Sequence, residues 1–405
     1  MKPEFTAERG IYKFQWEDGI QIQLDRFQEK SGTLSAEITI RLPKASRHLH
    51  QARLNLQSTR ARNELARHLE EIKEETLWVD YLEQVCTLAI QKYREGEPLV
   101  RLGEGEIELP RYLLYPVVPE NQPTVIFGDG GVGKSTTANL FAILASVPWN
   151  DNPFEIGVNG KSNTLYLDWE TDKSAADWNV KRLSRGLNKK SDYMFYRRCE
   201  LPLGIDLPEI QKHILEVDAN FVIIDSALAA CGGDPSSPEV TGQYFRDLRQ
   251  LKVTSLTLAH NSKNSTGEKT IYGSVFWSNF ARSVWELKKN QETETDVIDV
   301  GLFCRKANLS KLFNPIGLRY TYSNGKIEVE RHEISDNPSL ASSLPIWIQL
   351  TNELKRGAMQ IPELADSLGV SEAVIRTTLN RNKERFIKVT TGWALRAREE
   401  KLAGI

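Results

Sequence analysis

The sequence has little cysteine, no long apolar run and no excess of either charge. Its four cysteines are Cys86, Cys199, Cys231 and Cys304, and none stands in a CxxC spacing. The six histidines are scattered, so we expect no zinc-type metal site. The apolar runs are shorter than the about 18 residues that a bilayer span requires, which excludes a membrane-spanning protein. Because Met1–Phe5 starts no apolar signal segment, we expect a reduced, cytoplasmic protein without membrane contact.

Charge and length narrow the class of protein further. Lysine and arginine total 52 against 54 aspartates and glutamates, a formal net charge of -2, which excludes a globally basic nucleic-acid coat. Any nucleic-acid partner must therefore be met by a local patch. With 405 residues, of which 40% are hydrophobic and 26% charged, the chain suits an ordinary globular protein of about two to three domains.

The patterns divide the chain into three segments, 1–110, 111–335 and 345–405. The first has alternating strands around Asp18-Gly19, a hairpin signal, and then a helical period over 61–93, so we expect a small β+α module of unknown role. Its stretch 41–67 holds seven lysines and arginines, and either a solvated face or a contact with nucleic acid or a protein partner explains them. The second segment alternates strands and helices, which predicts a parallel sheet with crossover helices.

A phosphate-binding motif opens the second segment. The run matches G-x-x-x-x-G-K-[ST] and consists of Gly128, Asp129, Gly130, Gly131, Val132, Gly133, Lys134 and Ser135. The apolar strand 124–127 precedes it and an apolar helix follows, which is the context that a P-loop requires. The glycines allow backbone amides to approach phosphates at a helix N-terminus. We expect Lys134 to reach the β- and γ-phosphates of ATP, Ser135 to ligate Mg²⁺ and Thr136 to support the α-phosphate.

Acidic residues end two further strands. Asp225 follows the apolar run 221–224, which is typical of a central parallel strand, so its carboxylate is expected at the edge where ligands bind. We interpret Asp225 as the second Mg²⁺ residue. Asp168 and Glu170 end the strand that begins at Thr164, and either one could act as the base that activates water.

Together these motifs resemble one branch of the RecA-like ATPases, that of the RepA-type hexameric plasmid helicases and the AAA family ATPases. The resemblance spans about 160 residues and rests on five blocks in the expected order, which are 126–136, 165–170, 221–226 with 232–234, 258–263 and 272–282. It implies an α/β fold. The RecA-like P-loop NTPase core, a parallel sheet flanked by helices, would stand between the N-terminal module and a C-terminal winged helix-turn-helix.

The resemblance also assigns roles to single residues. It implies that Glu170, rather than Asp168, is the catalytic glutamate and that His260 senses the γ-phosphate. Gly273 and Ser274 match the turn before a helix that leads to Arg282, which would act as an arginine finger on a neighbouring subunit's nucleotide. Arg182 matches an arginine that flanks the adenine. Lys306 matches a strand lysine that faces the adjoining active site.

The last segment resembles a winged helix. The stretch 359–371 is similar to the first helix and turn of a helix-turn-helix, and a third helix with polar and basic side chains follows it. Residues 346–405 carry a net charge of about +3, opposite in sign to the whole chain. We expect Arg376, Arg381 and Lys383 to contact DNA. The alternative is a winged helix that contacts protein.

The sequence therefore predicts a Mg²⁺-dependent ATPase that works as a ring-shaped homo-oligomer on DNA. A helicase or helicase loader of replication or of a mobile element is the expected role, with the core loops 232–237 and 262–269 facing DNA. Two alternatives stay open. One is a DNA-binding initiator or regulator in which ATP only switches the oligomeric state, without unwinding. The other is a RecA-like ATPase that acts on protein.

Overall fold

The structure is a computed structural model. It describes residues 2–43, 49–74, 76–103, 106–190, 192–261, 271–273, 275–291 and 295–396. Contacts divide the chain into two compact units. One consists of residues 1–110, 201–220 and 243–253, and the other of residues 111–200, 221–242 and 254–405. The expected three-domain division, with boundaries near residues 110 and 340, stays a prediction.

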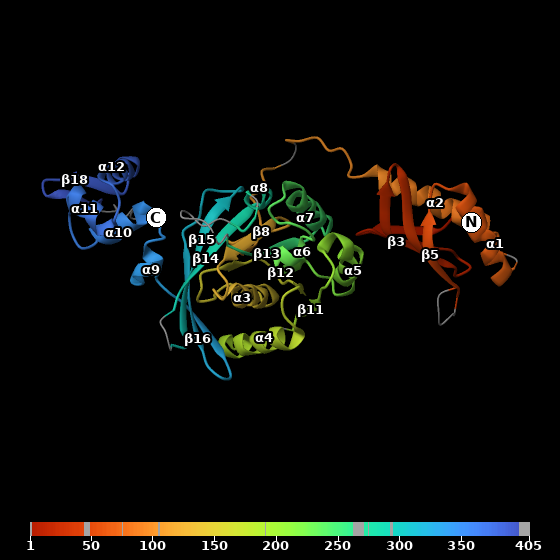
Figure 1. Cartoon of the computed structure of the whole chain (residues 1–405), viewed down its shortest axis with the longest axis horizontal. Coiled ribbons are helices and arrows are strands. Elements are labelled where there is room, and N and C mark those ends of the chain that lie inside the picture. Colours follow the sequence, from red (N-terminus) through yellow and green to blue (C-terminus); the bar gives the residue numbers. More distant parts are fainter. Residues whose placement is uncertain are drawn as a thin grey trace, which may run out of the picture. The chain divides into compact units, whose positions relative to one another are not determined.

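The first unit contains a five-stranded antiparallel sheet in which the strands follow chain order (Figure 1). The strands are β1 (Glu4–Glu8), β2 (Ile11–Gln15), β3 (Gln21–Lys30), β4 (Thr33–Arg41) and β5 (His50–Asn55). Helices α1 (Thr59–Ile72) and α2 (Trp78–Glu95) follow, and the Ser58 side chain caps α1 by accepting from the Ala61 amide. Alternate strand residues such as Phe14, Ile22 and Ile38 are buried with Leu69 of α1, because each strand turns one face to the helices.

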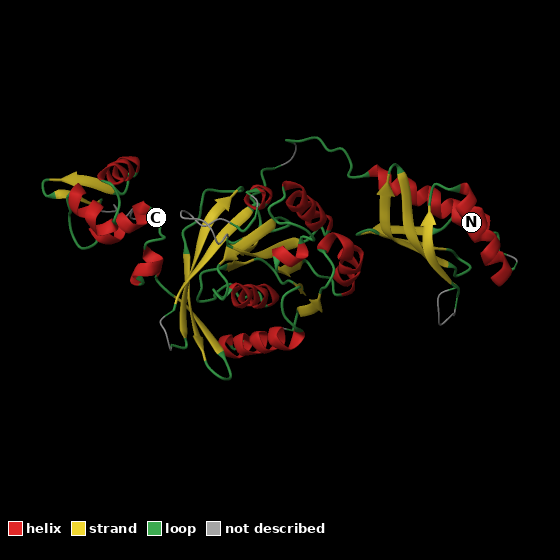
Figure 2. Cartoon of the chain, viewed as in Figure 1, coloured by secondary structure: helices red, strands yellow, loops and turns green. Residues whose placement is uncertain are grey.

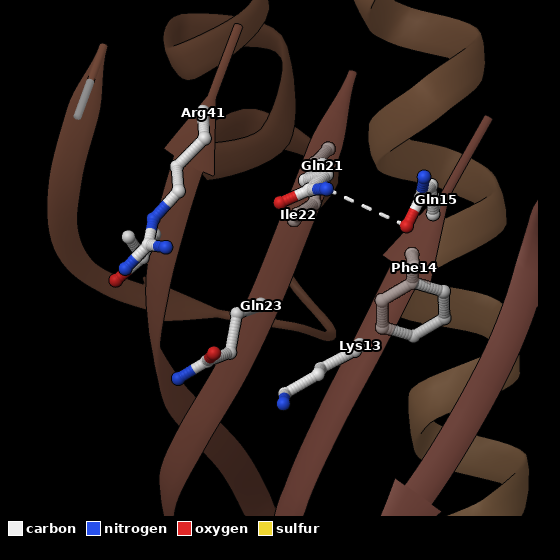
Figure 3. Close-up of a pocket in the computed structure, with 8 residues that line it drawn as sticks. Lys13, Phe14, Gln15, Gln21, Ile22, Gln23 and Arg41 are labelled. Atoms are coloured by element: carbon white, nitrogen blue, oxygen red, sulfur yellow. Dashed lines mark hydrogen bonds between the residues drawn. The ribbon is translucent and has the colours of Figure 1, made fainter. Parts of the chain in front are cut away.

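The other face of this sheet is polar. Figure 3 shows Lys13, Gln15, Gln21, Gln23 and Arg41 around a shallow cavity of about 280 Å³ on strands β2 to β4. Gln21 donates a hydrogen bond to Gln15 across the strand pair at 3.4 Å. Strand alternation therefore produces one apolar and one polar face, as the sequence pattern predicts.

The second unit is built on a nine-stranded sheet whose order is β11-β10-β12-β13-β8-β14-β15-β16-β17. Its strands are β8 (Pro123–Gly128), β10 (Thr164–Asp168), β11 (Met194–Arg198), β12 (Phe221–Asp225), β13 (Thr254–His260), β14 (Ser283–Asn290), β15 (Val297–Ala307), β16 (Ile316–Tyr322) and β17 (Ile327–Arg331). The first six strands in the spatial order are parallel, and the last three continue antiparallel. A three-stranded sheet, in the order β7-β6-β9, consists of β6 (Tyr112–Tyr115), β7 (Val118–Pro119) and β9 (Gly157–Val158).

Helices flank the large sheet (Figure 2). Helix α3 (Lys134–Ser146) is buried over almost its whole length, and its Leu140, Phe141 and Leu144 share a core with sheet residues such as Ile126 and Trp285. Helix α4 (Lys173–Leu187) packs against α3 and β17 and begins at an Asp172 cap. The second unit also contains α6 (Ala227–Ala230) and α8 (Phe276–Phe280), whereas α5 (Leu203–Glu216) belongs to the first unit and the unit boundary falls within α7 (Pro238–Gln250). The predicted α/β fold with a mostly parallel sheet flanked by helices is confirmed.

Short helices and one hairpin end the described chain. After η1 (Ile334–Asp336) and α9 (Pro338–Ala341) come α10 (Ile346–Leu354), α11 (Ile361–Leu368), α12 (Glu372–Arg381) and the antiparallel pair β18 (Phe386–Val389) and β19 (Gly392–Leu395). Leu364 of α11 and Ile375 and Leu379 of α12 are buried in one small core with Phe386. Gly369 ends α11 in the left-handed conformation, with φ of 62°. Among the residues that the structure describes, no helix has the length and apolar character to cross a membrane.

Candidate active site

Four parallel strands of the large sheet end at one edge and bring the expected site residues together. The register pairs Asp168 of β10 with Asp225 of β12, and His260 of β13 with Gly128 of β8. These strands are almost wholly buried, so their polar end residues project where the sheet meets solvent. Residues separated by more than 130 positions in the sequence thus form one cluster.

The P-loop connects β8 to α3 and forms an open cradle. Gly131 and Gly133 have φ of 66° and 93°, which a residue with a side chain rarely adopts. No atom lies within 4 Å of a Cβ built on Gly130, Gly131 or Gly133, so the loop borders open space. Gly128 is required for a different reason, because a Cβ there would lie 2.5 Å from the Leu287 carbonyl oxygen of β14.

Lys134 lies in the first turn of α3 and is 7% exposed. Its Nζ donates to the carbonyl oxygens of Gly128 at 3.0 Å and Asp129 at 2.9 Å. Burial lowers the pKa of Lys134, and the carboxylates of Asp225, Glu170 and Asp129 oppose that shift. The ammonium group is thus held inside the loop that it closes, beside the cradle.

Ser135 and Asp225 lie in contact, as the sequence predicts for a shared metal site. The Ser135 hydroxyl donates to Asp225 Oδ2 at 2.6 Å. Tyr166 of the neighbouring strand donates to the same oxygen, also at 2.6 Å. Burial raises the pKa of the Asp225 carboxyl, whereas these two hydrogen bonds oppose the increase. Hydroxyl and carboxylate oxygens are the ligand type that Mg²⁺ prefers.

The two acids after β10 have different environments. Asp168 is 1% exposed, and its Oδ1 accepts from the amides of Glu170 and Thr171 at 2.8 and 2.9 Å. Its Oδ2 accepts from the Thr171 hydroxyl at 2.6 Å and the Tyr196 hydroxyl at 3.1 Å. Asp168 is therefore fully engaged in holding the turn that presents Glu170. The Glu170 side chain is 38% exposed and faces the cluster.

Glu170 has two polar neighbours at the sheet edge. The Ser226 hydroxyl donates to Glu170 Oε1, and His260 Nε2 lies 3.3 Å from the same oxygen. Asn261, which follows His260, donates to Asp129 Oδ1 in the P-loop at 3.1 Å. The ends of β10, β12 and β13 are thus linked to one another and to the P-loop.

Arg182 lies on α4, beside aromatic side chains near the start of α3. Its guanidinium is 4.2 Å from the ring centroid of Trp178 and 5.5 Å from that of Tyr322, and it donates to the Ser323 carbonyl. Thr136 accepts from the Asn179 amide of α4 at 3.4 Å. Gly186 of the same helix packs so closely on β17 that a Cβ there would overlap the Ile327 carbonyl. Arg182 is 8% exposed, whereas Trp178 is 57% exposed, so a planar ligand group could stack on the Trp178 ring.

Arg282 lies at the opposite end of the parallel strands from the P-loop. Its amide donates to the carbonyl of Pro123, the first residue of β8, and its side chain is exposed. Five residue steps along the strand separate Pro123 from Gly128, or about 16 Å. Lys306 Nζ donates to three carbonyls at the end of α8, those of Ser278, Asn279 and Ala281. Arg282 is therefore remote from its own P-loop, and Lys306 is engaged within its own subunit.

Parts of two predicted features lie outside the described residues, namely Ser274 and the loop 262–269. Gly273, with φ of 105°, is described, as is the loop 232–237. The C-terminal cations Arg376, Arg381 and Lys383 are exposed on or after α12, and Arg376 pairs with Glu372 at 2.9 Å.

Sequence patterns gave no role to several residues of the cluster. Ser226 directly follows Asp225, and Asn261 directly follows His260, so the sequence alone could have suggested that both lie near the site. The contact of Tyr166 with the site could not be predicted, because an aromatic residue inside a strand ordinarily indicates packing in the core. Trp178 and Tyr322 come from distant segments, and nothing in the sequence joins them.

One family model matches the part of the chain that holds this site. Residues 90–266 match the family model of the AAA domain, a stretch that includes the P-loop, Glu170, Asp225 and His260. No curated protein matches the chain. Among solved structures, a KaiC-like protein of the hyperthermophilic archaeon Pyrococcus horikoshii is 15% identical, with a TM-score of 0.39 over 57% of this chain and 99% of that chain. The chain is thus similar to an AAA domain over residues 90–266, and its second unit has the α/β fold of a RecA-like core, a mostly parallel sheet flanked by helices.

Proposed function

We propose that the protein is a Mg²⁺-dependent ATP hydrolase that works as an oligomer on DNA. The observation that carries the hydrolase part is the meeting of Lys134, Ser135, Asp225 and Glu170 at one sheet edge, around a loop lined by open space. A phosphate countercharge, a metal-ligand pair and an acid that faces solvent are the parts that phosphoryl transfer to water requires.

The residues present fit a Mg²⁺–triphosphate. The cradle at Gly130, Gly131 and Gly133 leaves the volume that phosphate oxygens need, and the N-terminus of α3 is directed at it. Ser135 and Asp225 would hold the metal ion through hard oxygen atoms. When bound, Mg²⁺ would neutralise phosphate charge.

The chain's own groups then have distinct tasks. Lys134 would exchange its contacts with the Gly128 and Asp129 carbonyls for phosphate oxygens, because an ammonium group binds a charged oxygen more strongly than a neutral carbonyl. Glu170 would orient a water molecule and take its proton. Ser226 and His260 contact one oxygen of Glu170 and so fix the direction of its carboxylate. His260 would thereby register whether the γ-phosphate is in place.

The position of Arg282 supports an oligomer. Since this arginine is exposed about 16 Å along the strands from its own P-loop, it has no path to the nucleotide of the same subunit. It would act as a finger on the nucleotide of a neighbouring subunit, and a ring would give each site one such arginine. This makes self-association a condition of full activity.

The C-terminal segment supports DNA as the partner. Three helices and a two-stranded hairpin follow one another there, and α12 buries Ile375 and Leu379 while Arg376, Thr377, Asn380 and Arg381 are exposed. We interpret this unit as a winged helix whose α12 enters a major groove. A DNA-binding unit joined to an ATPase ring suits a helicase, or a helicase loader, of replication or of a mobile element.

ATPase rates of the purified protein test the proposal. They are measured alone, with single-stranded DNA and with duplex DNA, together with the mass in solution and unwinding of a forked duplex. Hydrolysis that DNA stimulates in an oligomer, with unwinding, supports the helicase. Hydrolysis with DNA binding but no unwinding indicates the ATP-switched initiator, and hydrolysis that ignores DNA indicates the protein-directed ATPase. No hydrolysis in any condition contradicts the proposal.

A further inference from the structure

Tyr166 is the one aromatic hydroxyl in contact with Asp225 among the residues that the structure describes. It lies inside β10, 5% exposed, and its hydroxyl donates to Asp225 Oδ2 at 2.6 Å. Its ring stacks on that of Tyr196, its register partner on β11, with centroids 6.4 Å apart and planes at 16°. The ring position is therefore fixed by packing on the strand next to the carboxylate.

The hydrogen bonds on Asp225 are unevenly distributed. Oδ2 accepts from both Ser135 and Tyr166, and no partner of Oδ1 is found within the described part of the chain. A carboxylate rotates easily about its last bond, because that torsion has broad minima. Two donors on one oxygen hold the plane of the group and leave the other oxygen for a further ligand.

We propose that Tyr166 is a positioning residue for the metal site, which fixes the Asp225 carboxylate so that Asp225 and Ser135 hold Mg²⁺ together. This inference rests on the proposed function and assigns it a residue that acts through Asp225. A carboxylate oxygen can only accept, so the Tyr166 hydroxyl is the donor of this hydrogen bond.

A matched pair of variants tests the assignment. Tyr166→Phe keeps the stacked ring and removes the donor to Asp225. Tyr196→Phe removes the equivalent hydroxyl on the facing ring, which donates to Asp168 instead. Binding of a fluorescent ATP analogue is titrated for each protein with Mg²⁺ and with EDTA, and Mn²⁺ binding is followed by electron paramagnetic resonance.

For Tyr166→Phe we expect the Mg²⁺ concentration at half-saturation to rise about 10- to 100-fold, as for loss of a hydrogen-bond partner of a metal ligand. Affinity in EDTA should stay within about twofold, and Mn²⁺ binding should weaken in parallel. Tyr196→Phe should match the wild type in metal dependence. Replacing Tyr166 by 4-aminophenylalanine restores an N–H donor on the same ring and should restore the Mg²⁺ response.

Two results would overturn the assignment. One is an unchanged Mg²⁺ dependence in Tyr166→Phe while the wild type responds to metal, which leaves the proposed ATPase intact. The other is an equal loss of binding in EDTA, which indicates general damage to the nucleotide site. Tyr166→Phe could instead lower the melting temperature. The 4-aminophenylalanine variant then decides between the two explanations. If that variant is folded like the wild type and still loses the Mg²⁺ response, the positioning role is contradicted. Wild-type protein that binds no nucleotide with or without Mg²⁺ removes both the inference and the proposed function.

Discussion

Asp168 accepts a hydrogen bond from the backbone amide of Glu170 at 2.8 Å, so one acid of the pair positions the other. This relationship favours Glu170 over Asp168 as the base that we propose. The Asp168 carboxylate accepts four hydrogen bonds from its own turn and the neighbouring strand, which leaves little room for a water molecule at its oxygens. Glu170 faces the cluster and is 38% exposed.

Glu170→Gln should keep nucleotide binding and reduce hydrolysis by about 10²- to 10⁴-fold, because the amide retains the shape and loses the base. Binding of labelled ATP and release of phosphate measure the two effects separately. Asp168→Asn is the comparison, since it puts an amide where two backbone N–H groups and two hydroxyls donate. It should lower stability by about 1–3 kcal/mol in urea unfolding. Hydrolysis that survives Glu170→Gln would contradict the assignment.

Lys134→Ala should lower hydrolysis by at least about 10²-fold, because the countercharge for the phosphates is lost. Phosphate release at saturating ATP measures this. Lys181→Ala is a matched control, since that lysine lies on α4, is 66% exposed and pairs with Asp177 at 2.6 Å. The control should retain wild-type turnover. Equal rates in the two variants would argue against the P-loop as the site of hydrolysis.

Arg282→Ala and Lys134→Ala should complement each other in mixtures if the arginine acts between subunits. A mixed oligomer would contain sites with an intact P-loop beside an intact Arg282, and some activity should return. The measurement is the ATPase rate against mixing ratio, with size-exclusion chromatography to show that both variants assemble. A flat line at the level of the inactive variants, with assembly intact, would rule out the finger.

Replacing Arg376, Arg381 and Lys383 together by alanine should weaken DNA binding and make its salt dependence shallower. Each cation that no longer neutralises a phosphate reduces the slope of log K against log salt by about 0.9. Fluorescence anisotropy at several salt concentrations gives that slope. Arg356→Ala is a suitable control, because it follows α10, is 81% exposed and contacts Glu353. The same slope in both proteins would favour a protein partner for this unit.

The sequence predicted the parts of the molecule that depend on a short motif or on the hydrophobic periodicity of one segment. The P-loop demands a strand, a glycine turn and a helix, and β8, Gly133 and α3 follow in that order. The alternation around Asp18-Gly19 likewise predicts β2 and β3. Such features depend on neighbours in the chain, and a single sequence contains them.

Contacts between strands that are distant in the sequence could not be predicted in this way. Nothing near Tyr166 in the sequence indicates that its hydroxyl meets Asp225, because that contact depends on which strands are neighbours and on their register. The engagement of Asp168 by Tyr196 has the same origin. The antiparallel extension of the sheet through β15, β16 and β17 also places Tyr322 beside Arg182, and only the assembled sheet shows it.

The close packing of Gly186 against Ile327 has a consequence for the position of Arg182. A Cβ on Gly186 would overlap the Ile327 carbonyl oxygen, so any side chain there would push α4 away from β17. Trp178 and Arg182 lie on α4, whereas Tyr322 ends β16, the strand that pairs with β17. A glycine one helical turn from Arg182 thus keeps its guanidinium beside both aromatic rings.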